Sequence, residues 1–400
     1  MSSSGPAFAA TKQQFIDQVR NEYLGYEKKM SAAYQTFQEG SAKKYEDYKK
    51  YQTESFERFA RQAEQDAQKL DKWLSQDLES VTKQYRGDSA KLRDYTNKIN
   101  PNYLSSPMQQ YTNSTNPNYL GSFMMNYKNA VNENYLNSPM MKFKNAVNEN
   151  YLNSPMMKYK NAVNANYLNS PMFHLKNGSN TNYLNSIMYK YNRGSLSQQE
   201  AVKQWGELYK TETQAIQNIG NRSMEEIKQT EAAAKEAIFK QKCTTVQGIL
   251  DQRKQTLETI AKLHQEYFGE EISFEPLIPD LGEINVLLNG EWLCFEQPPT
   301  QINGSTLVPM RTIFEKLGVD VTWHQETSSI TATKGSTKIS LTIDKPTATV
   351  NGQTITLGTP PRLINSYTMV PIRFVSESLG AEVNWDEGSK TVFITLKESD

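Results

Sequence analysis

Apolar residues recur every eleven positions along the first hundred residues of the chain. Eleven residues over three turns give about 3.67 residues per turn, close to the relaxed α-helix. No proline lies between Pro6 and Pro101 to interrupt the pattern. It predicts one long helix over residues 11–98, whose leading apolar row is Phe15, Tyr26, Phe37, Tyr48, Phe59, Leu70 and Val81.

A second stretch, residues 197–268, has the same period. Ser195 and Ser197 are candidate N-terminal caps, and Gly269 is a candidate end signal. Because equal periods suit mutual packing, the simplest arrangement is a long antiparallel helical hairpin with a coiled-coil core. Pairing of each helix with a second copy of itself is an alternative that the sequence leaves open. The second half of the predicted core is Trp205, Ile216, Ile227, Ile238, Ile249 and Ile260.

Residues 100–195 consist of six tandem 16-residue units, typified by NENYLNSPMMKFKNAV at 132–147. Such repeats predict stacked units that bury their apolar side against their neighbours. Ser-Pro, as at 138–139, is a typical helix start, and the Asn-rich segment before it suits a turn. Each unit is therefore expected to be a short helix plus a linker, with a rung of a β-solenoid as the competing interpretation.

One tyrosine recurs in every unit and is always followed by leucine. Tyrosine has an apolar ring and a polar hydroxyl, which favours interfaces with sugars or proteins. The competing interpretation is that this tyrosine, the leucine, the methionine and the second aromatic residue of each unit form the core of the repeats, which is the role we expect of the leucines and methionines. The candidate interaction surface consists of Tyr103, Tyr119, Tyr135, Tyr151, Tyr167 and Tyr183.

Residues 284–397 are richer in β-branched residues, turn glycines and prolines, and they contain a duplication with an offset of 62. Val308-Pro309-Met310-Arg311 matches Val370-Pro371-Ile372-Arg373, and Trp323 matches Trp385. Each half is expected to form a hairpin, a helix and a hairpin, with Asn-Gly at the first turn. The expected product is an α+β domain with two similar lobes, joined to the helical part by a linker over 269–283.

This duplicated segment resembles the copper amine oxidase N-terminal-like (stalk) domain, because the Val-Pro-x-Arg, Glu-x-Leu-Gly and Trp elements occur twice in the same order. The resemblance implies an accessory role in a secreted or cell-surface protein of a Gram-positive bacterium. It implies neither copper nor oxidase activity, because those belong to a separate catalytic domain of that family. Residues 1–280 resemble no family that we recognise.

The composition of the chain limits the classes of partner that it is expected to bind. Lys plus Arg and Asp plus Glu are both 44, which removes the electrostatic case for nucleic acid. No apolar run is long enough to span a membrane. The two cysteines, Cys243 and Cys294, fall in different predicted parts, so nothing indicates that they pair. Residues 1–10 are expected to be a leader remnant or a flexible tail, since Ala7-Phe8-Ala9 resembles the end of a signal peptide.

Catalytic chemistry is not apparent. His174, His264 and His324 are the only histidines and stand apart, and no phosphate-binding loop or nucleophile motif occurs. We therefore predict no enzyme, no cofactor and no catalytic or metal-binding residues. The expected function is that of a secreted or cell-surface structural protein, with a coiled-coil spacer that presents the repeats for adhesion or self-assembly. The alternatives are a pore-forming helical hairpin and a protein that binds glycan or cell wall.

Overall fold

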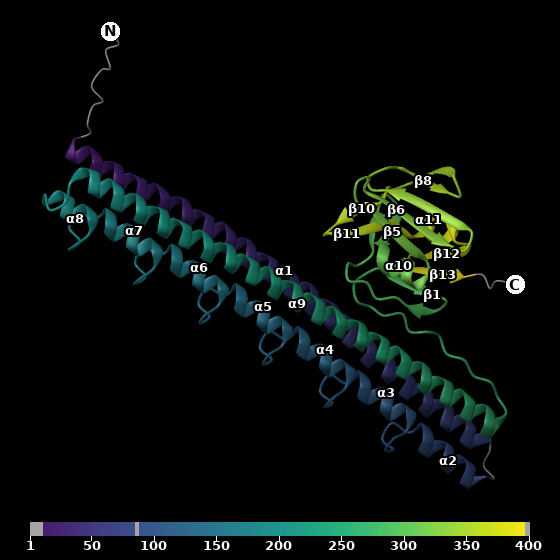
Figure 1. The fold of residues 1–400 in the computed structure, drawn as a ribbon. Helices are drawn as coiled ribbons and strands as arrows, with labels where there is room; N and C mark the ends of the chain where they lie inside the picture. The colour runs from purple at the N-terminus through teal and green to yellow at the C-terminus, as the bar shows by residue number, and fades with distance from the viewer. Residues whose placement is uncertain (1–10, 85–87, 397–400) are drawn as a thin grey trace. The chain divides into compact units, whose positions relative to one another are not determined.

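The computed structural model describes residues 11–84 and 88–396. It confirms the expected class, mainly α with a C-terminal α+β domain (Figure 1). Residues 1–10, which include the expected leader, lie outside the described residues. The chain divides into two compact units, residues 1–52 with 129–238 and residues 53–128 with 239–400.

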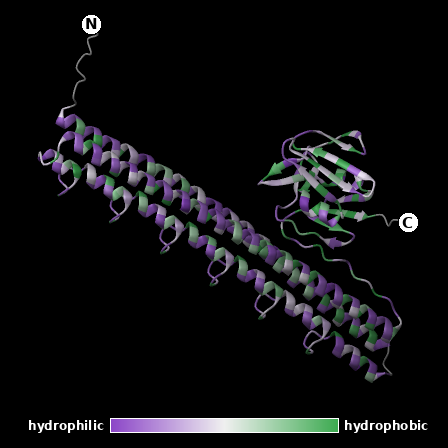
Figure 2. Ribbon diagram, in the orientation of Figure 1, coloured by the Kyte–Doolittle hydropathy of each residue, from purple (hydrophilic) through white to green (hydrophobic). Residues whose placement is uncertain are grey.

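Two long helices frame the helical part, α1 (Lys12–Gln84) and α9 (Gln198–Phe268). Hydrophilic residues prevail along both, with hydrophobic positions interspersed at regular intervals (Figure 2). The Ser197 hydroxyl accepts a hydrogen bond from the amide of Glu200 at the start of α9. Gly269 follows its last residue with φ of 75°, so both predicted end signals of this helix are confirmed.

The predicted antiparallel hairpin is wrong, because α1 and α9 run parallel. In the first unit Trp205 donates to Glu22, and Tyr26 packs against Tyr209. In the second unit Arg253 pairs with Asp66 and His264 with Asp77. Partner numbers rise together along both helices, which only parallel helices allow. The direction is set by the repeats, which carry the chain back to the start of α1 before α9 begins.

The helix predicted over 11–98 is two helices rather than one. After residues 85–87, which lie outside the described residues, the Asp88 carboxylate caps α2 (Ser89–Ile99) by accepting from the amide of Lys91. Tyr95 of α2 lies sixteen residues before Tyr111, the second tyrosine of the first 16-residue repeat. Both side chains are fully buried. Residues 88–99 therefore resemble the helical part of a repeat, but they lack the Ser-Pro and Tyr-Leu signals that define the others.

Each 16-residue unit contributes one short helix, which excludes the β-solenoid. We expected stacked units to bury their apolar sides against each other, but these helices do not. They pack on the long helices instead. For example, the rings of Phe143 and Tyr45 contact each other edge to face, with their centroids 5.3 Å apart. The helices are α3 (Pro107–Thr115), α4 (Phe123–Val131), α5 (Pro139–Val147), α6 (Pro155–Val163), α7 (Pro171–Ser179) and α8 (Ile187–Asn192).

The two sequence periods describe one lattice. In the first unit Tyr159 packs on Tyr34, and Phe143, sixteen residues earlier, packs on Tyr45, eleven residues later. A three-turn step of eleven residues advances about 16.5 Å, at about 1.5 Å per residue. A nine-residue helix covers about 13.5 Å of that step, and its loop covers the rest. Each repeat therefore meets the same row of side chains one step along.

The C-terminal domain contains thirteen strands and two helices among residues 285–396. The helices, α10 (Met310–Lys316) and α11 (Ile372–Ser378), each follow a proline, as predicted. The strands are β1 (Asn285–Leu288), β2 (Glu291–Trp292), β3 (Thr300–Ile302), β4 (Ser305–Pro309), β5 (Asp320–His324), β6 (Ser329–Lys334), β7 (Thr337–Thr342), β8 (Thr347–Val350), β9 (Gln353–Thr356), β10 (Arg362–Ile364), β11 (Tyr367–Pro371), β12 (Ala381–Asp386) and β13 (Thr391–Leu396).

Three sheets mix the strands of the two sequence halves. Their orders are β12-β13-β1-β2, β10-β11-β4-β3 and β5-β6-β7-β8-β9. In the first, β1 of one half pairs in parallel with β13 of the other. In the second, the equivalent strands β4 and β11 pair antiparallel. The Asn-Gly turns at 289–290 and 351–352 have positive φ at both residues, as the predicted two-residue hairpins require.

The prediction of two lobes is wrong, because the halves share one core. Phe314 and Val308 of the first half lie in the same buried cluster as Val375, Val370 and Ile394 of the second. Each half lends its first hairpin to a sheet that the other half completes. In the third sheet β7, which has no counterpart in the other half, lies between β6 and β8.

Cys243 of α9 and Cys294 after β2 form a disulfide with their Cα atoms 5.8 Å apart. The sequence did not indicate this bond, because the cysteines lie 51 residues apart in different predicted parts. The segment 269–284 returns along α9, where Arg253 donates to the carbonyl of Glu275. Lys242 and Glu283 form an ion pair at 2.8 Å, and both side chains are buried.

Gly220 and Gly206 of α9 make a matched test of the packing between α9 and the repeats. A Cβ at Gly220 would lie 2.9 Å from Cε2 of the buried Tyr159, whereas a Cβ at Gly206 would meet nothing within 4 Å. Alanine in an exposed helix position gains up to about 1 kcal/mol over glycine, and overpacking costs about 1–3 kcal/mol. We expect Gly206→Ala to raise the free energy of unfolding and Gly220→Ala to lower it, measured by urea titration. Equal gains at both positions would refute the close approach.

Candidate functional site

The linkers between the short helices are closed turns with the same hydrogen bonds in each unit. In the linker 148–154, the Asn148 side chain accepts from the amide of Asn150 at 2.9 Å. The Ser154 hydroxyl donates to the Asn148 carbonyl at 2.7 Å, which closes the loop. Asn153 has φ of 61°, a conformation that asparagine tolerates better than most residues. The Asn-rich segment thus spends its polar groups on holding its own shape.

Serine ends each loop and begins each helix. The Ser154 hydroxyl accepts from the amide of Met157 at 3.0 Å, while Pro155 occupies the first helical turn. The same cap occurs in every unit, at Ser106, Ser122, Ser138, Ser154, Ser170 and Ser186. Loop and helix are therefore fixed relative to each other at every repeat, as the Ser-Pro signal predicted for four of the six units.

The recurring Tyr-Leu pairs occupy the middle of these loops, here called the loop tips. The loops project from the row of short helices away from α9 (Figure 1). Each tyrosine is about half exposed, from 45% at Tyr183 to 52% at Tyr103. Each leucine is more exposed, from 66% at Leu184 to 85% at Leu120. The structure thus places all six predicted surface tyrosines in solvent. The leucines, which the sequence assigned to the repeat core, are in solvent as well.

Methionine and the second aromatic side chain of each unit, replaced by Leu175 in the fifth, face the long helices instead. Met108, Met124, Met140, Met156, Met172 and Met188 have no exposed surface. Residues assigned to the coiled-coil core lie on the same interface. Tyr26, Phe37 and Tyr48 are half-buried, and the others are buried: Phe15, Phe59, Leu70, Val81, Trp205, Ile216, Ile227, Ile238, Ile249 and Ile260.

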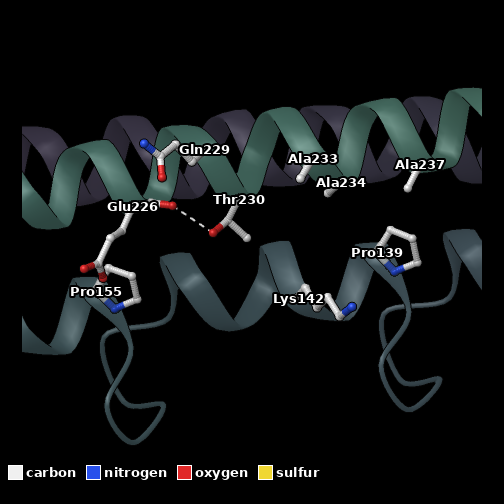
Figure 3. Close-up of a pocket in the computed structure, with 9 residues that line it drawn as sticks. All are labelled: Pro139, Lys142, Pro155, Glu226, Gln229, Thr230, Ala233, Ala234 and Ala237. Carbon is white, nitrogen blue, oxygen red and sulfur yellow. Dashed lines mark hydrogen bonds between the residues drawn. The ribbon is translucent and has the colours of Figure 1, made fainter.

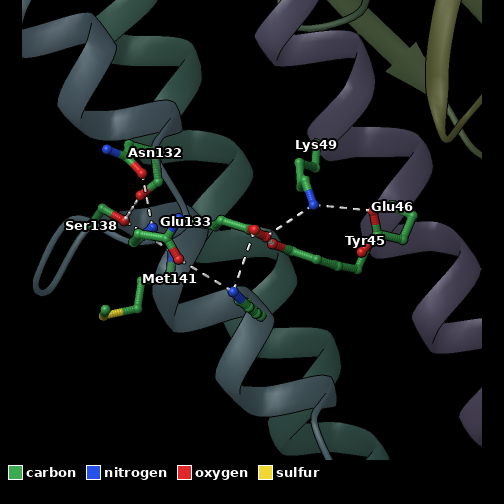
Figure 4. A network of polar contacts seen from close by, with 9 residues as sticks. Tyr45, Glu46, Lys49, Asn132, Glu133, Ser138 and Met141 are labelled. Atoms are coloured by element: carbon green, nitrogen blue, oxygen red, sulfur yellow. Dashed lines mark hydrogen bonds and ion pairs between the residues drawn. The ribbon is translucent and has the colours of Figure 1, made fainter.

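Charged groups fix the repeats of the first unit to α1. Glu133 accepts a hydrogen bond from Tyr45, and its carboxylate lies 3.1 Å from the ammonium of Lys49. Figure 4 shows both contacts. One repeat later, Glu149 accepts from Tyr34 at 2.6 Å and pairs with Lys160 at 2.9 Å. The hydrogen bonds from Tyr34 and Lys160 lower the pKa of Glu149. Burial, together with the hydrogen bond to Glu149, raises the pKa of Tyr34.

The second unit contains two networks of the same design, which sequence reasoning missed. Asp66 of α1 accepts two hydrogen bonds of 2.7 Å, one from Nε of Arg253 in α9 and one from the hydroxyl of Tyr111 in a repeat helix. Eleven residues further on, Asp77 accepts from Tyr95 at 2.8 Å and contacts Nε2 of His264 at 3.1 Å. The signal was present, because Arg253 and His264 share the spacing of Asp66 and Asp77. His264 is thus a buried structural residue.

Among residues 11–84 and 88–396, no group of three or more His, Cys, Asp or Glu side chains could hold a metal ion. In the same part of the chain, no helix is both long and apolar enough to cross a membrane. Most of the exposed large hydrophobic side chains in the described residues belong to the Tyr-Leu loop tips, which we take as the candidate functional site.

Comparison with known proteins concerns a quarter of the chain. Residues 287–394 match the family model described as copper amine oxidase N-terminal domain, in agreement with the resemblance of the duplicated segment. A protein of Brevibacillus choshinensis named "Protease inhibitor" is 36% identical over 112 residues, which are 28% of this chain and 34% of that protein. The chain thus matches about a third of the length of this curated relative. The family match is to the N-terminal domain, which is not the catalytic one.

The contacts of Glu149 make an acid-dependent contribution to stability. Its pKa is lowered by folding, so the contribution is present above its ordinary pKa of about 4.3 and is lost as the pH falls through the lower folded value. We expect the unfolding free energy of Glu149→Gln to depend less steeply on pH than that of the wild type between about pH 3 and 5. Urea titrations across this range test it, with Glu39→Gln at an exposed position of α1 as the control. Identical pH profiles for Glu149→Gln and the wild type would contradict it.

Proposed function

We propose that this protein is a non-catalytic structural protein of the cell surface or the secreted fraction, whose repeats present Tyr-Leu loop tips for self-assembly. The observation that carries the proposal is the exposure of a leucine and a tyrosine at the same place in every repeat. Isolated exposed leucines are ordinary, but regularly repeated apolar pairs on rigid loops are typical of contact surfaces. Burying one such leucine in a contact would contribute about 1.5–3 kcal/mol, and several at once would act together.

The location outside the cell is supported by the Cys243–Cys294 disulfide, since such bonds persist in oxidising compartments. The match to the copper amine oxidase N-terminal domain supports an accessory role for residues 287–394. In the proposed protein, the long helices hold the loop tips and the C-terminal domain anchors the chain or joins copies of it.

The loop tips can be changed without touching the fold. We expect replacement of the six tip leucines by serine to abolish concentration-dependent assembly, measured by sedimentation velocity and electron microscopy, with helical content unchanged. The replaced residues are Leu104, Leu120, Leu136, Leu152, Leu168 and Leu184.

The matched control replaces exposed apolar residues away from the loops, Leu24 and Val202, by serine, and should assemble as the wild type does. Assembly of the six-serine variant at wild-type concentrations would refute the role of the tips. Retention of the wild type on a polysaccharide, lost in the six-serine variant, would instead favour the glycan-binding alternative. Leakage from liposomes would favour the pore-forming one.

The name of the Brevibacillus choshinensis relative favours a second candidate, inhibition of a protease. The similar segment covers only part of both proteins, so the whole relative's activity transfers to this chain only as a hypothesis. Stoichiometric loss of bacterial protease activity on adding the purified chain, with no cleavage of the chain itself, would support it.

A further inference from the structure

Two crevices lie between α9 and the repeat helices of the first unit. One has a volume of about 500 Å³ and is lined by Pro139, Lys142, Pro155, Ala233, Ala234 and Ala237 (Figure 3). The other has a volume of about 450 Å³, and its lining includes Leu152, Lys158, Tyr167, Pro171, Ile219 and Arg222. Both volumes fall within the range of about 300–1,000 Å³ that ligand pockets have.

The two crevices are successive copies of one site. Lys142 and Pro155 of the first stand sixteen residues before Lys158 and Pro171 of the second. On α9, Thr230 of the first stands eleven residues after Ile219 of the second. The repeat side thus shifts by one 16-residue unit while the α9 side shifts by one eleven-residue step. The lattice that aligns the helices also reproduces the cavity.

The equivalent position in another repeat shows which kind of side chain fits such a crevice. In α4, Phe123 stands where α5 has Pro139, and Gly248 of α9 stands eleven residues after Ala237. A Cβ at Gly248 would lie 2.6 Å from Cε1 of Phe123, so the ring rests directly on the glycine. At this repeat a phenylalanine covers the surface of α9 that Pro139 and Ala237 leave open in the next one. The site accepts a bulky apolar side chain.

We propose that the crevices receive the Tyr-Leu loop tips of a second copy of this chain, an inference that rests on the proposed function. The tips supply bulky apolar side chains that the described chain leaves exposed, with Leu120 at 85% and Leu136 at 74%. The crevices offer apolar walls rimmed by Lys142 and Glu226, suited to the ring and hydroxyl of a tyrosine.

Spacing favours a second copy over an unrelated partner. Tips and crevices both recur with the repeat, about every 16.5 Å, so one pair in place aligns its neighbours.

The natural plug can be moved to test this. Pro139→Phe with Ala237→Gly recreates the Phe123–Gly248 pair in the first crevice and leaves every loop tip intact. We expect at least a tenfold rise in the concentration needed for assembly, measured by sedimentation velocity. The reverse exchange, Phe123→Pro with Gly248→Ala, removes the natural plug and should assemble at least as readily as the wild type.

A second variant guards against misfolding of the first. Ala233→Glu places a charge on an exposed position of the crevice wall and should also weaken assembly. Wild-type assembly by both crevice variants, while the six-serine loop variant fails to assemble, would overturn the crevices as acceptors and leave the proposed function standing. A wild type that stays monomeric at every concentration would overturn both. Reduced polysaccharide binding without reduced assembly would make a glycan the occupant.

Discussion

The helical part depends on one geometric agreement, between a 16-residue repeat and an eleven-residue step of a straight helix. A nine-residue helix and its folded loop advance the chain by about 16.5 Å, which equals three turns of α-helix. Every repeat therefore meets α1 and α9 with the same face. If the loop advanced the chain differently, Phe143 would still reach Tyr45, but Tyr159 would miss Tyr34. The regular exposure of the loop tips follows from the same agreement.

Much of this arrangement was accessible from the sequence. The eleven-residue rows, the Ser-Pro caps and the Asn-Gly hairpins depend on local chemistry, and each is present in the structure. Helix direction depends on no local signal, because an apolar row reads the same in both directions. The lengths of the segments carry the information on direction. Six repeats return the chain by about 100 Å, and a 73-residue helix is about 110 Å long. A return of that length makes the next helix parallel to the first.

The errors in the other parts have a related cause. The duplication of residues 284–397 fixed the elements of each half but not their pairing, because β1 can pair with a strand of either half. Only the shared core shows that Phe314 and Val375 belong together. The Cys243–Cys294 bond and the contacts of Asp66 and Asp77 likewise join residues far apart in sequence. The tip leucines were misplaced because an apolar residue in a repeat is usually taken for core, whereas the loop that carries Leu152 is closed by its own asparagines and needs no apolar support.

The position of the half-buried acidic side chains explains why the exposed surface is apolar. Glu133 and Glu149, the only acidic residues of the repeats, are used to hold the short helices on α1 through Tyr45 and Tyr34. The asparagines of the loops are used on the loop backbone. What is left to face solvent is Tyr-Leu, with lysines such as Lys142 and Lys158 at its side. The loop conformation does not require this apolar surface, because a polar residue in place of Leu152 could adopt the same turn. The proposed contact between copies would account for the repetition of this surface, and the crevices of the first unit recur with the same period.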